Sequence, residues 1–294
     1  MATIFDNTIE LPNKEILIQT QSLIGFESKF NRIYNNLKLL LDQDSLSNWS
    51  KKHHKVELPI IKQLKEKYPL IILAGDAGTG KTISAAAIAD RMTRELNKEG
   101  FFLKLSTRVR GEGLHGEMGK LVNEAFSQLK SQAGKRRFAF LLIDEADAIA
   151  TTRATSQMHQ EEKAAVNTLI QKIDEIRELN GRAVIFMSTN RLHFIDEAIL
   201  RRAAVILEFE RPTFEECKEL YSQSLDGLDF TSEQLDELAS MSIAIKTSDL
   251  GYSFSDIRLK VLPEAIANAY PSQPLSFSIL KETIKSIKPS PAIK

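Results

Sequence analysis

Two kinds of hydrophobic pattern alternate in the middle of the chain. Short runs of consecutive apolar residues are followed by segments in which apolar residues recur every three or four positions. The first pattern is typical of strands buried on both faces of a parallel sheet, and the second of amphipathic helices. The runs predict strands at residues 70–74, 101–105, 138–143, 183–187 and 205–209. Because predicted strands and helices alternate, the pattern indicates an α/β fold, with a parallel sheet flanked by helices.

The segments on either side of this alternation follow a different pattern. The N-terminal part is polar and rich in lysine, and its apolar residues between Phe30 and Leu41 have helical spacing. After Pro212 the strand-type runs stop, and Thr213 and Thr231 stand where helix N-caps are expected. Helices are predicted at residues 213–225, 232–241, 254–269 and 276–285. The expected domains are an N-terminal helical or linker segment (1–68), an α/β large domain (69–211) and a small all-helical lid domain (212–288).

Composition narrows the class of protein. The 294 residues are 43% hydrophobic and 27% charged, as in ordinary soluble globular proteins. Thirty-nine basic residues balance thirty-nine acidic ones, so no bulk electrostatic attraction to nucleic acid or to a membrane is expected. The single cysteine, Cys217, favours a reducing compartment. The apolar runs are too short to span a bilayer and the first ten residues do not resemble a secretory signal, so a cytoplasmic location is expected.

A glycine-rich segment between the first predicted strand and the next helix fits the pattern G-x-x-x-x-G-K-[ST]. Its glycines let successive backbone N–H groups face a phosphate, and the following helix directs its positive end at the same anion. In this pattern the Lys81 ammonium contacts the β- and γ-phosphates, and the Thr82 hydroxyl is a ligand of Mg²⁺. The candidate nucleotide-binding residues are Gly75, Asp76, Ala77, Gly78, Thr79, Gly80, Lys81 and Thr82.

Polar residues that follow two later strands point to the same nucleotide. Asp144 and Glu145 end the apolar run 138–143, and ligands gather at the carboxyl ends of parallel strands. We therefore expect Asp144 in the Mg²⁺ shell and Glu145 beside the attacking water. Asn190 follows the strand 183–187, and its amide can help to hold that water. Taken alone, an asparagine at a strand end is more often a turn residue.

Two adjacent arginines, Arg201 and Arg202, end a short predicted helix. Arginines at that position can simply offset the helix dipole. The functional alternative is an arginine finger, which reaches the γ-phosphate held by a neighbouring subunit and stabilises the charge of the transition state. Such a finger acts only in an assembly of several subunits.

The order of these features resembles the AAA+ ATPases over about residues 20–287. The resemblance implies ATP and Mg²⁺ as cofactors and a ring homo-oligomer, with a hexamer expected. It also implies that Asn190 is sensor 1 and that Arg202 is the finger, because Arg202 precedes Pro212 by the spacing typical of the family. Arg201 is the second candidate for that role.

Two further roles follow from the same resemblance. Gly25 is expected in the entry segment that closes over adenine. Arg258 is a candidate for sensor 2, although the Ser-Gly-Arg of related ATPases is replaced here by residues 255–257, Ser-Asp-Ile. The arginine that usually precedes the Val166-Asn167 pair is also missing, since Ala164 stands there.

A narrower likeness concerns the client. Residues 119–122 (Gly-Lys-Leu-Val), the pair Leu262-Pro263 and Tyr270 resemble the pachytene-checkpoint ATPases that open HORMA-domain proteins. Relatives of those ATPases occur in bacterial anti-phage operons built around a cyclic-nucleotide synthase. In this likeness Leu114 and His115 occupy the pore-loop position of a Trp-Phe pair.

Three functions compete on this evidence. The first is an ATP-driven ring that remodels a protein client, with HORMA-domain proteins as the leading candidates. The second is a nucleic-acid ATPase of the clamp- or helicase-loader type, which zero net charge disfavours but Arg108 and Arg110 keep open. The third is a nucleotide-dependent scaffold, against which the intact pair Asp144-Glu145 argues.

Overall fold

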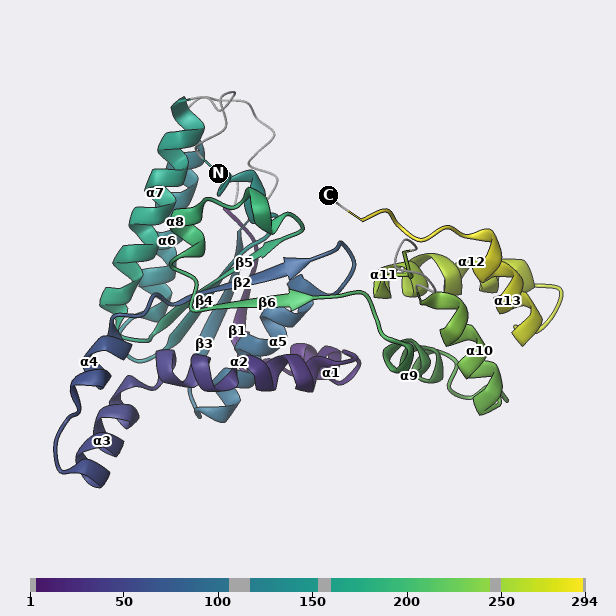
Figure 1. Ribbon diagram of the computed structural model, residues 1–294, viewed down its shortest axis with the longest axis horizontal. Coiled ribbons are helices and arrows are strands. Elements are labelled where there is room, and N and C mark those ends of the chain that lie inside the picture. The colour runs from purple at the N-terminus through teal and green to yellow at the C-terminus, as the bar shows by residue number, and fades with distance from the viewer. Residues whose placement is uncertain (1–3, 106–116, 153–159, 244–249, 293–294) are drawn as a thin grey trace. The chain divides into compact units, whose positions relative to one another are not determined.

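The computed structural model describes residues 4–105, 117–152, 160–243 and 250–292 (Figure 1). These residues cluster in two compact units. The larger unit comprises Met1–Gln21, Glu27–Ala74 and Thr82–Glu208, and the smaller unit comprises Ser22–Phe26, Gly75–Lys81 and Phe209–Lys294. Most of the glycine-rich segment therefore groups with the C-terminal helices.

A mostly parallel sheet forms the centre of the larger unit. Its described strands are β1 (Phe5–Leu11), β2 (Leu70–Gly75), β3 (Gly100–Leu105), β4 (Phe138–Ile143), β5 (Ala183–Thr189) and β6 (Val205–Phe209). They lie in the order β1-β3-β4-β5-β2-β6, and the pairs β3–β4, β4–β5 and β2–β5 are parallel. All residues of β4 and β5 are buried, which explains their continuous apolar runs. The predicted α/β fold with a parallel sheet is confirmed.

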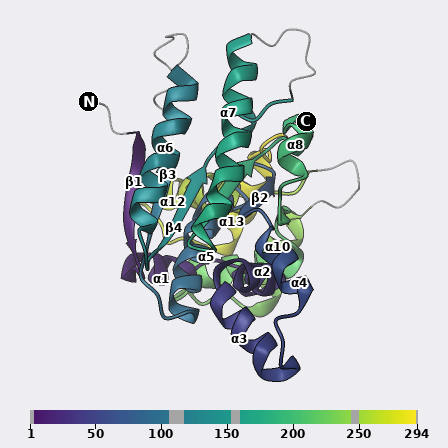
Figure 2. The ribbon, with the colours of Figure 1, turned by 90° about the vertical axis from the view of Figure 1, so that its left-hand side faces the viewer.

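Helices cover both faces of this sheet. On one face, α6 (Glu117–Ala133) and α7 (Gln160–Ile176) lie side by side and pack on the strands (Figures 1 and 2). The strands alternate between the two faces, and Ile71, Leu73 and Phe140, which point to the other face, are also fully buried. The helix α5 (Lys81–Glu95) follows β2, and the short helix α8 (Glu197–Leu200) precedes β6.

The N-terminal segment differs from the expectation, because it adds a strand to the sheet. Strand β1 pairs antiparallel with β3 and only its two ends, Phe5 and Leu11, are buried. A strand that exposes most of its side chains lacks the continuous apolar run by which the other strands were predicted. Four helices follow: α1 (Lys14–Gln21), α2 (Phe26–Leu41), α3 (Gln43–His54) and α4 (Pro59–Lys65).

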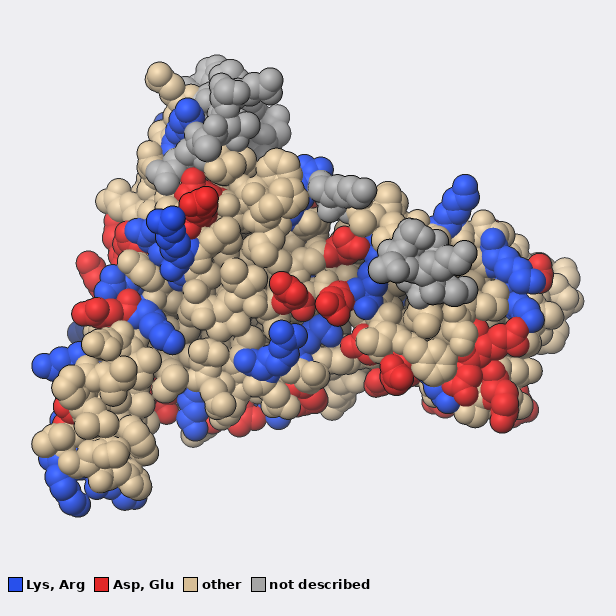
Figure 3. Space-filling model, in the orientation of Figure 1, with Lys and Arg blue, Asp and Glu red and all other residues tan. Residues whose placement is uncertain are grey.

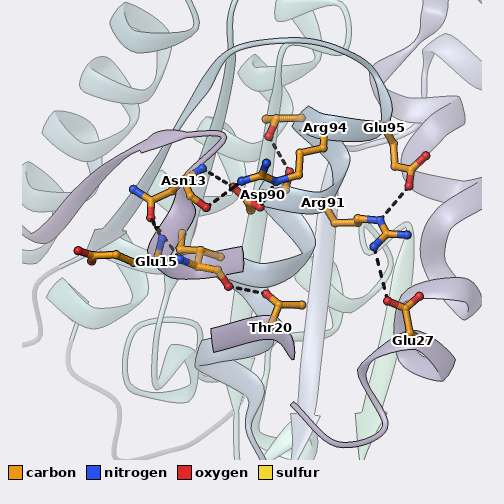
Figure 4. Close-up of polar contacts among 10 residues, drawn as sticks. Asn13, Glu15, Thr20, Glu27, Asp90, Arg91, Arg94 and Glu95 are labelled. Carbon is orange, nitrogen blue, oxygen red and sulfur yellow. Dashed lines mark hydrogen bonds and ion pairs between the residues drawn. The ribbon is translucent and has the colours of Figure 1, made fainter. Parts of the chain in front are cut away.

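A polar cluster ties this N-terminal segment to α5 (Figure 4). The buried Asp90 carboxylate accepts hydrogen bonds from the backbone N–H of Asn13 and from Arg94 Nε, both at 2.6 Å. Arg94 in turn donates to the backbone oxygen of Asn13 at 2.8 Å. One turn away, Arg91 pairs with Glu95 at 2.8 Å and with Glu27 at 3.6 Å. Both α1 and α2 are thus held against the helix that begins at Lys81.

The smaller unit is helical, as predicted. It contains α9 (Phe214–Ser224), α10 (Ser232–Ser242), α11 (Phe254–Asp256), α12 (Leu262–Ala269) and α13 (Phe277–Ser286) around a core of its own. Capping boxes at Thr213 and Thr231 begin α9 and α10. The helix predicted at 254–269 is interrupted by a π-helical turn at Ile257–Val261. Among the described residues, no helix has both the length and the apolar character that crossing a bilayer requires.

Candidate active site

The carboxylate of Asp144 lies at the centre of a polar cluster in the larger unit. Asp144 follows β4, and its carboxylate accepts a hydrogen bond from Thr82 Oγ1 at 3.0 Å and another from the Ser188 hydroxyl of β5. Lys104 Nζ, from β3, lies 3.2 Å from Asp144 Oδ2. The three strands are neighbours and parallel, so their carboxyl ends bring these side chains together.

Asp144 is held in its charged form. Burial disfavours the charge, but the hydrogen bond from Ser188 and the nearby Lys104 ammonium outweigh it and lower the pKa of Asp144 below its ordinary value. A charged carboxylate beside a threonine hydroxyl is a donor set that Mg²⁺ accepts. The residues therefore fit the expected metal site. The sequence analysis did not predict two members of the cluster, Ser188 and the charged Lys104. The signal for Lys104 was a single charge in the otherwise apolar run of β3.

The glycine-rich loop surrounds the Lys81 ammonium. Lys81 is buried, and its Nζ donates to the backbone oxygens of Gly75 at 2.8 Å and Asp76 at 2.7 Å. Gly80 has φ +93°, and a Cβ built on it would have no neighbour within 4 Å, so this side of the loop is open. The first backbone N–H groups of α5 have no partner within the helix and follow directly after Gly80. A positive charge, helix-end amides and open space are what a polyphosphate requires.

The loop also has an ionic partner that the motif does not explain. Arg211 Nε lies 2.7 Å from Asp76 Oδ2, and the same guanidinium donates to the backbone oxygens of Gly251 (2.5 Å) and Ser290 (2.8 Å). On the other side, Ser255 N donates to Gly78 O at 3.1 Å. Within the smaller unit, the phosphate loop is thus bonded directly to α11, and through Arg211 it is linked to Gly251 and the C-terminal tail.

Glu145 has a backbone conformation that few residues other than glycine adopt. Its φ and ψ are 49° and 47°, and its N–H donates to Asp144 Oδ1 at 3.2 Å. Such conformations are uncommon and tend to occur at functional sites. The Glu145 side chain is exposed. Asn190 directly follows β5, the neighbour of β4, so the two expected water-positioning residues leave adjacent strands.

The two arginines after α8 have different surroundings. The Arg201 side chain is 79% exposed and pairs with Glu197, one helical turn away, at 3.2 Å. Arg202 forms a bidentate pair with Asp174 of α7, at 2.6 and 3.1 Å, and its guanidinium lies 5.3 Å from the ring centroid of Tyr68. The hydrogen bond to Asp174 raises the pKa of Arg202. Arg202 is therefore held in a fixed orientation by its own subunit.

Gly25 and Arg258 lie together in the smaller unit. Gly25 has φ +69°, and its neighbour Ile24 is buried in the core of the C-terminal helices. Arg258 lies in the π-helical turn and donates from Nη2 to the backbone oxygen of Ser22 at 2.8 Å. Burial lowers the pKa of Arg258. The expected sensor 2 arginine thus bonds to the entry segment. Leu114 and His115, the expected pore-loop residues, lie outside the described residues.

Comparison with known proteins shows similarity over nearly the whole chain. The model of the "ATPase family associated with various cellular activities (AAA)" matches residues 71–211. CD-NTase-associated protein 6 of Escherichia coli strain KTE188 is 44% identical over 293 residues, which cover 99% of this chain and 98% of that protein.

Two solved structures match both units. A chain in the structure of the E. coli MS115-1 HORMA:CdnC:Trip13 complex has a TM-score of 0.90 and 35% identity, and the match covers 99% of this chain and 97% of that one. The structure of Rhizobiales Trip13 has a TM-score of 0.74 and 29% identity, with 98% and 99% coverage. Since the likenesses extend far beyond the phosphate loop, the chain as a whole belongs to the AAA family of ATPases and is an ATP hydrolase.

Proposed function

We propose that this ATPase assembles into a ring and uses ATP hydrolysis to remodel a HORMA-domain protein in an anti-phage system. The observation that carries the proposal is the match, at a TM-score of 0.90 over 99% of the chain, to a protein solved together with a HORMA protein and CdnC. The 44% identity to a protein named for its association with a CD-NTase supports the same setting.

The described residues supply the parts that hydrolysis needs. Thr82 and Asp144 would hold Mg²⁺, which neutralises charge on the phosphates when it is bound. Lys81 leaves its two backbone acceptors for the β- and γ-phosphates of ATP, and Glu145 and Asn190 orient the water for in-line attack. Arg202 of a neighbouring subunit stabilises the charge that develops on the transferred phosphoryl group.

The contact between Arg202 and Asp174 bears on how the finger acts. A bidentate guanidinium–carboxylate pair fixes the plane of the arginine, and two of its donors are used in that pair. Nη1 also donates to the backbone oxygen of Ala198 at 2.9 Å. The two N–H bonds that then remain on the guanidinium can meet a phosphate without loss of the fixed orientation. In this proposal Asp174 positions Arg202, whereas the exposed Arg201 remains a second candidate for the finger.

The proposal is tested with the HORMA-domain protein that we expect beside this gene. The client should raise the ATPase rate several-fold and should become protease-sensitive only when ATP is hydrolysed. The Glu145→Gln variant should bind ATP and retain the client without changing it, because the carboxylate that orients water is lost. Lys81→Ala should bind neither.

Two control ligands separate the alternatives. An unrelated folded protein should leave the ATPase rate unchanged, and so should single- or double-stranded DNA. If DNA stimulates turnover and the HORMA-domain protein does not, the chain is a nucleic-acid ATPase and the proposal is wrong. If Glu145→Gln hydrolyses ATP at the wild-type rate, its assigned role is wrong.

A further inference from the structure

The helices α3 and α4 form a hairpin with an unusual surface. The α3–α4 hairpin is defined here as Gln43–Lys65, which includes both helices and the turn between them. Within the larger unit, Trp49, Val56 and Ile60 leave 47%, 57% and 52% of their surface exposed. Large exposed side chains that lie this close together in sequence are typical of contact surfaces.

The hairpin is ordered by its own hydrogen bonds, so this surface is preformed. The buried Ser50 hydroxyl donates to the backbone oxygen of Val56 and accepts from the N–H of Leu58, both at 2.9 Å. The Trp49 ring lies against His54, with 5.2 Å between ring centroids and an edge-on arrangement. A rigid tryptophan of this kind loses little conformational entropy on binding and is a common anchor of protein interfaces.

The charge of the hairpin indicates the kind of partner. The hairpin residues 43–65 contain five lysines and two acidic residues, and Lys51, Lys52 and Lys55 are exposed next to Trp49. Figure 3 shows basic side chains at this end of the larger unit. The partner must therefore present carboxylates around an apolar spot.

The smaller unit of the same chain carries a surface of that description. Residues 214–242, which include α9 and α10, contain eight acidic residues and one lysine. Figure 3 shows red side chains gathered over this region. Six of the carboxylates are exposed, namely Glu215, Glu219, Asp226, Asp229, Glu233 and Glu237. Leu228, 45% exposed, lies between two of them and provides the apolar spot. We name these residues the acidic lid face.

We propose that the α3–α4 hairpin of one subunit docks on the acidic lid face of the next copy in the ring. The inference rests on the proposed ring. A head-to-tail contact between two different patches of one chain repeats around a closed ring, so each subunit uses both patches. The contact joins the larger unit of one subunit to the smaller unit of its neighbour. Lid movement during hydrolysis is then transmitted to the neighbouring subunit.

Charge reversal and charge exchange test the contact. Assembly is measured by sedimentation velocity with ATP in the Glu145→Gln background, which holds the nucleotide. The variant K51E/K52E/K55E should raise the concentration for half-assembly about tenfold or more, and E219K/D226K/D229K should do the same. Combining all six changes should restore assembly to within about threefold of the wild-type value, because opposite charges face each other again.

Matched variants control for charge and for surface hydrophobicity. K98E/K135E/R136E reverses three exposed charges elsewhere on the larger unit and should leave assembly unchanged. Trp49→Ala should weaken assembly, whereas Ile18→Ala, at a side chain 66% exposed, should not. The thermal unfolding midpoint of each variant should stay at the wild-type value, because these residues are exposed. An unchanged midpoint excludes misfolding as the cause of weaker assembly.

The outcomes separate this inference from the proposed ring. If the Glu145→Gln protein does not assemble with ATP at any concentration, both fall. If it assembles and all the hairpin and lid variants assemble equally well, only the docking inference is wrong. It is also wrong if the hairpin variants assemble normally but lose client stimulation or DNA binding, because the hairpin then serves another partner.

Discussion

At the scale of single residues, the carboxylate of Asp144 has a positively charged neighbour that the sequence motif does not predict. Thr82 and Ser188 donate hydroxyls to it, and Lys104 adds a full positive charge at 3.2 Å. The lysine helps to keep Asp144 ionised. It also brings a positive charge close to the position where a divalent cation would be held, and like charges repel.

Lys104→Met should therefore bind Mg²⁺ more tightly together with a non-hydrolysable ATP analogue. We expect the half-saturating metal concentration to fall about two- to tenfold, a modest effect because the lysine is partly solvated. Manganese binding followed by electron paramagnetic resonance measures it directly. Lys98→Met, at an exposed lysine just before β3, should have no effect. Weaker metal binding by Lys104→Met would mean that the lysine mainly keeps Asp144 in place.

At the scale of elements, a buried aspartate at the end of α11 links several segments of the smaller unit. Asp256 is 1% exposed and accepts hydrogen bonds from Ser253 N at 3.0 Å, Lys260 Nζ at 2.7 Å and Ser290 Oγ at 2.6 Å. Burial disfavours its charge, but these hydrogen bonds outweigh burial and lower the pKa of Asp256 well below its ordinary value. The aspartate joins α11 to the C-terminal tail, which also contacts Arg211.

Asp256→Asn should lower the free energy of unfolding by about 1–3 kcal/mol at pH 7. The folded-state pKa is depressed, so the charged aspartate stabilises the protein above its unfolded pKa of about 3.9, and that stabilisation is lost as the pH falls toward the folded value. The difference between wild type and variant should thus shrink below about pH 4. Urea unfolding followed by circular dichroism measures it at each pH. Asp226→Asn, at an exposed position, is the control.

The labelling of Cys217 provides a second readout for the same variant. The thiol is buried in the core of the smaller unit, and burial raises its pKa to about 12. A thiol that is buried and protonated reacts slowly, so labelling reports the opening of this core. Asp256→Asn should speed labelling several-fold at pH 7, and an unchanged rate would place the lost stability in the larger unit.

The elements that sequence predicted well are those whose signal is local. Strands β2 to β5 are short apolar runs that are mostly buried in the sheet, and each of the capping boxes of α9 and α10 spans only four residues. Strand β1 was missed because it is held mainly by its pairing with β3, which leaves no apolar run. The bond between Asp76 and Arg211 joins residues 135 positions apart, so no local pattern contains it.

The same reasoning applies to the site. The phosphate loop and the acidic strand end are contiguous motifs, and the cluster of Thr82 with Asp144 follows from the parallel sheet. Arg258 was a candidate for sensor 2, but its bond to Ser22 depends on how the π-helical turn rotates the side chain. Sequence spacing assumes a regular helix, and a π turn changes the facing of every residue in it.

At the scale of the whole molecule, the proposed ring divides each ATP site between two subunits. The phosphate loop and Asp144 belong to the subunit that binds the nucleotide, while Arg202 comes from the next one. Within its own subunit, Arg202 is held in one orientation by Asp174 and Tyr68. An arginine that stabilises a phosphate on another subunit needs such a fixed orientation. This division predicts how two different inactive variants behave when they are mixed.

Lys81→Ala and Arg202→Ala should each be inactive alone, the first for want of nucleotide binding and the second for want of the finger. In a mixed ring, an Arg202→Ala subunit followed by a Lys81→Ala subunit has an intact loop and an intact finger at their shared site. Equal mixing should thus restore activity to about a quarter of the wild-type rate per site, the fraction of such neighbours in random order. Arg201→Ala keeps both the phosphate loop and Arg202, so it should be active alone. Mixing it with Lys81→Ala should give no activity beyond that of the Arg201→Ala subunits. If the first mixture stays inactive although mixed rings form, Arg202 does not act across the subunit boundary.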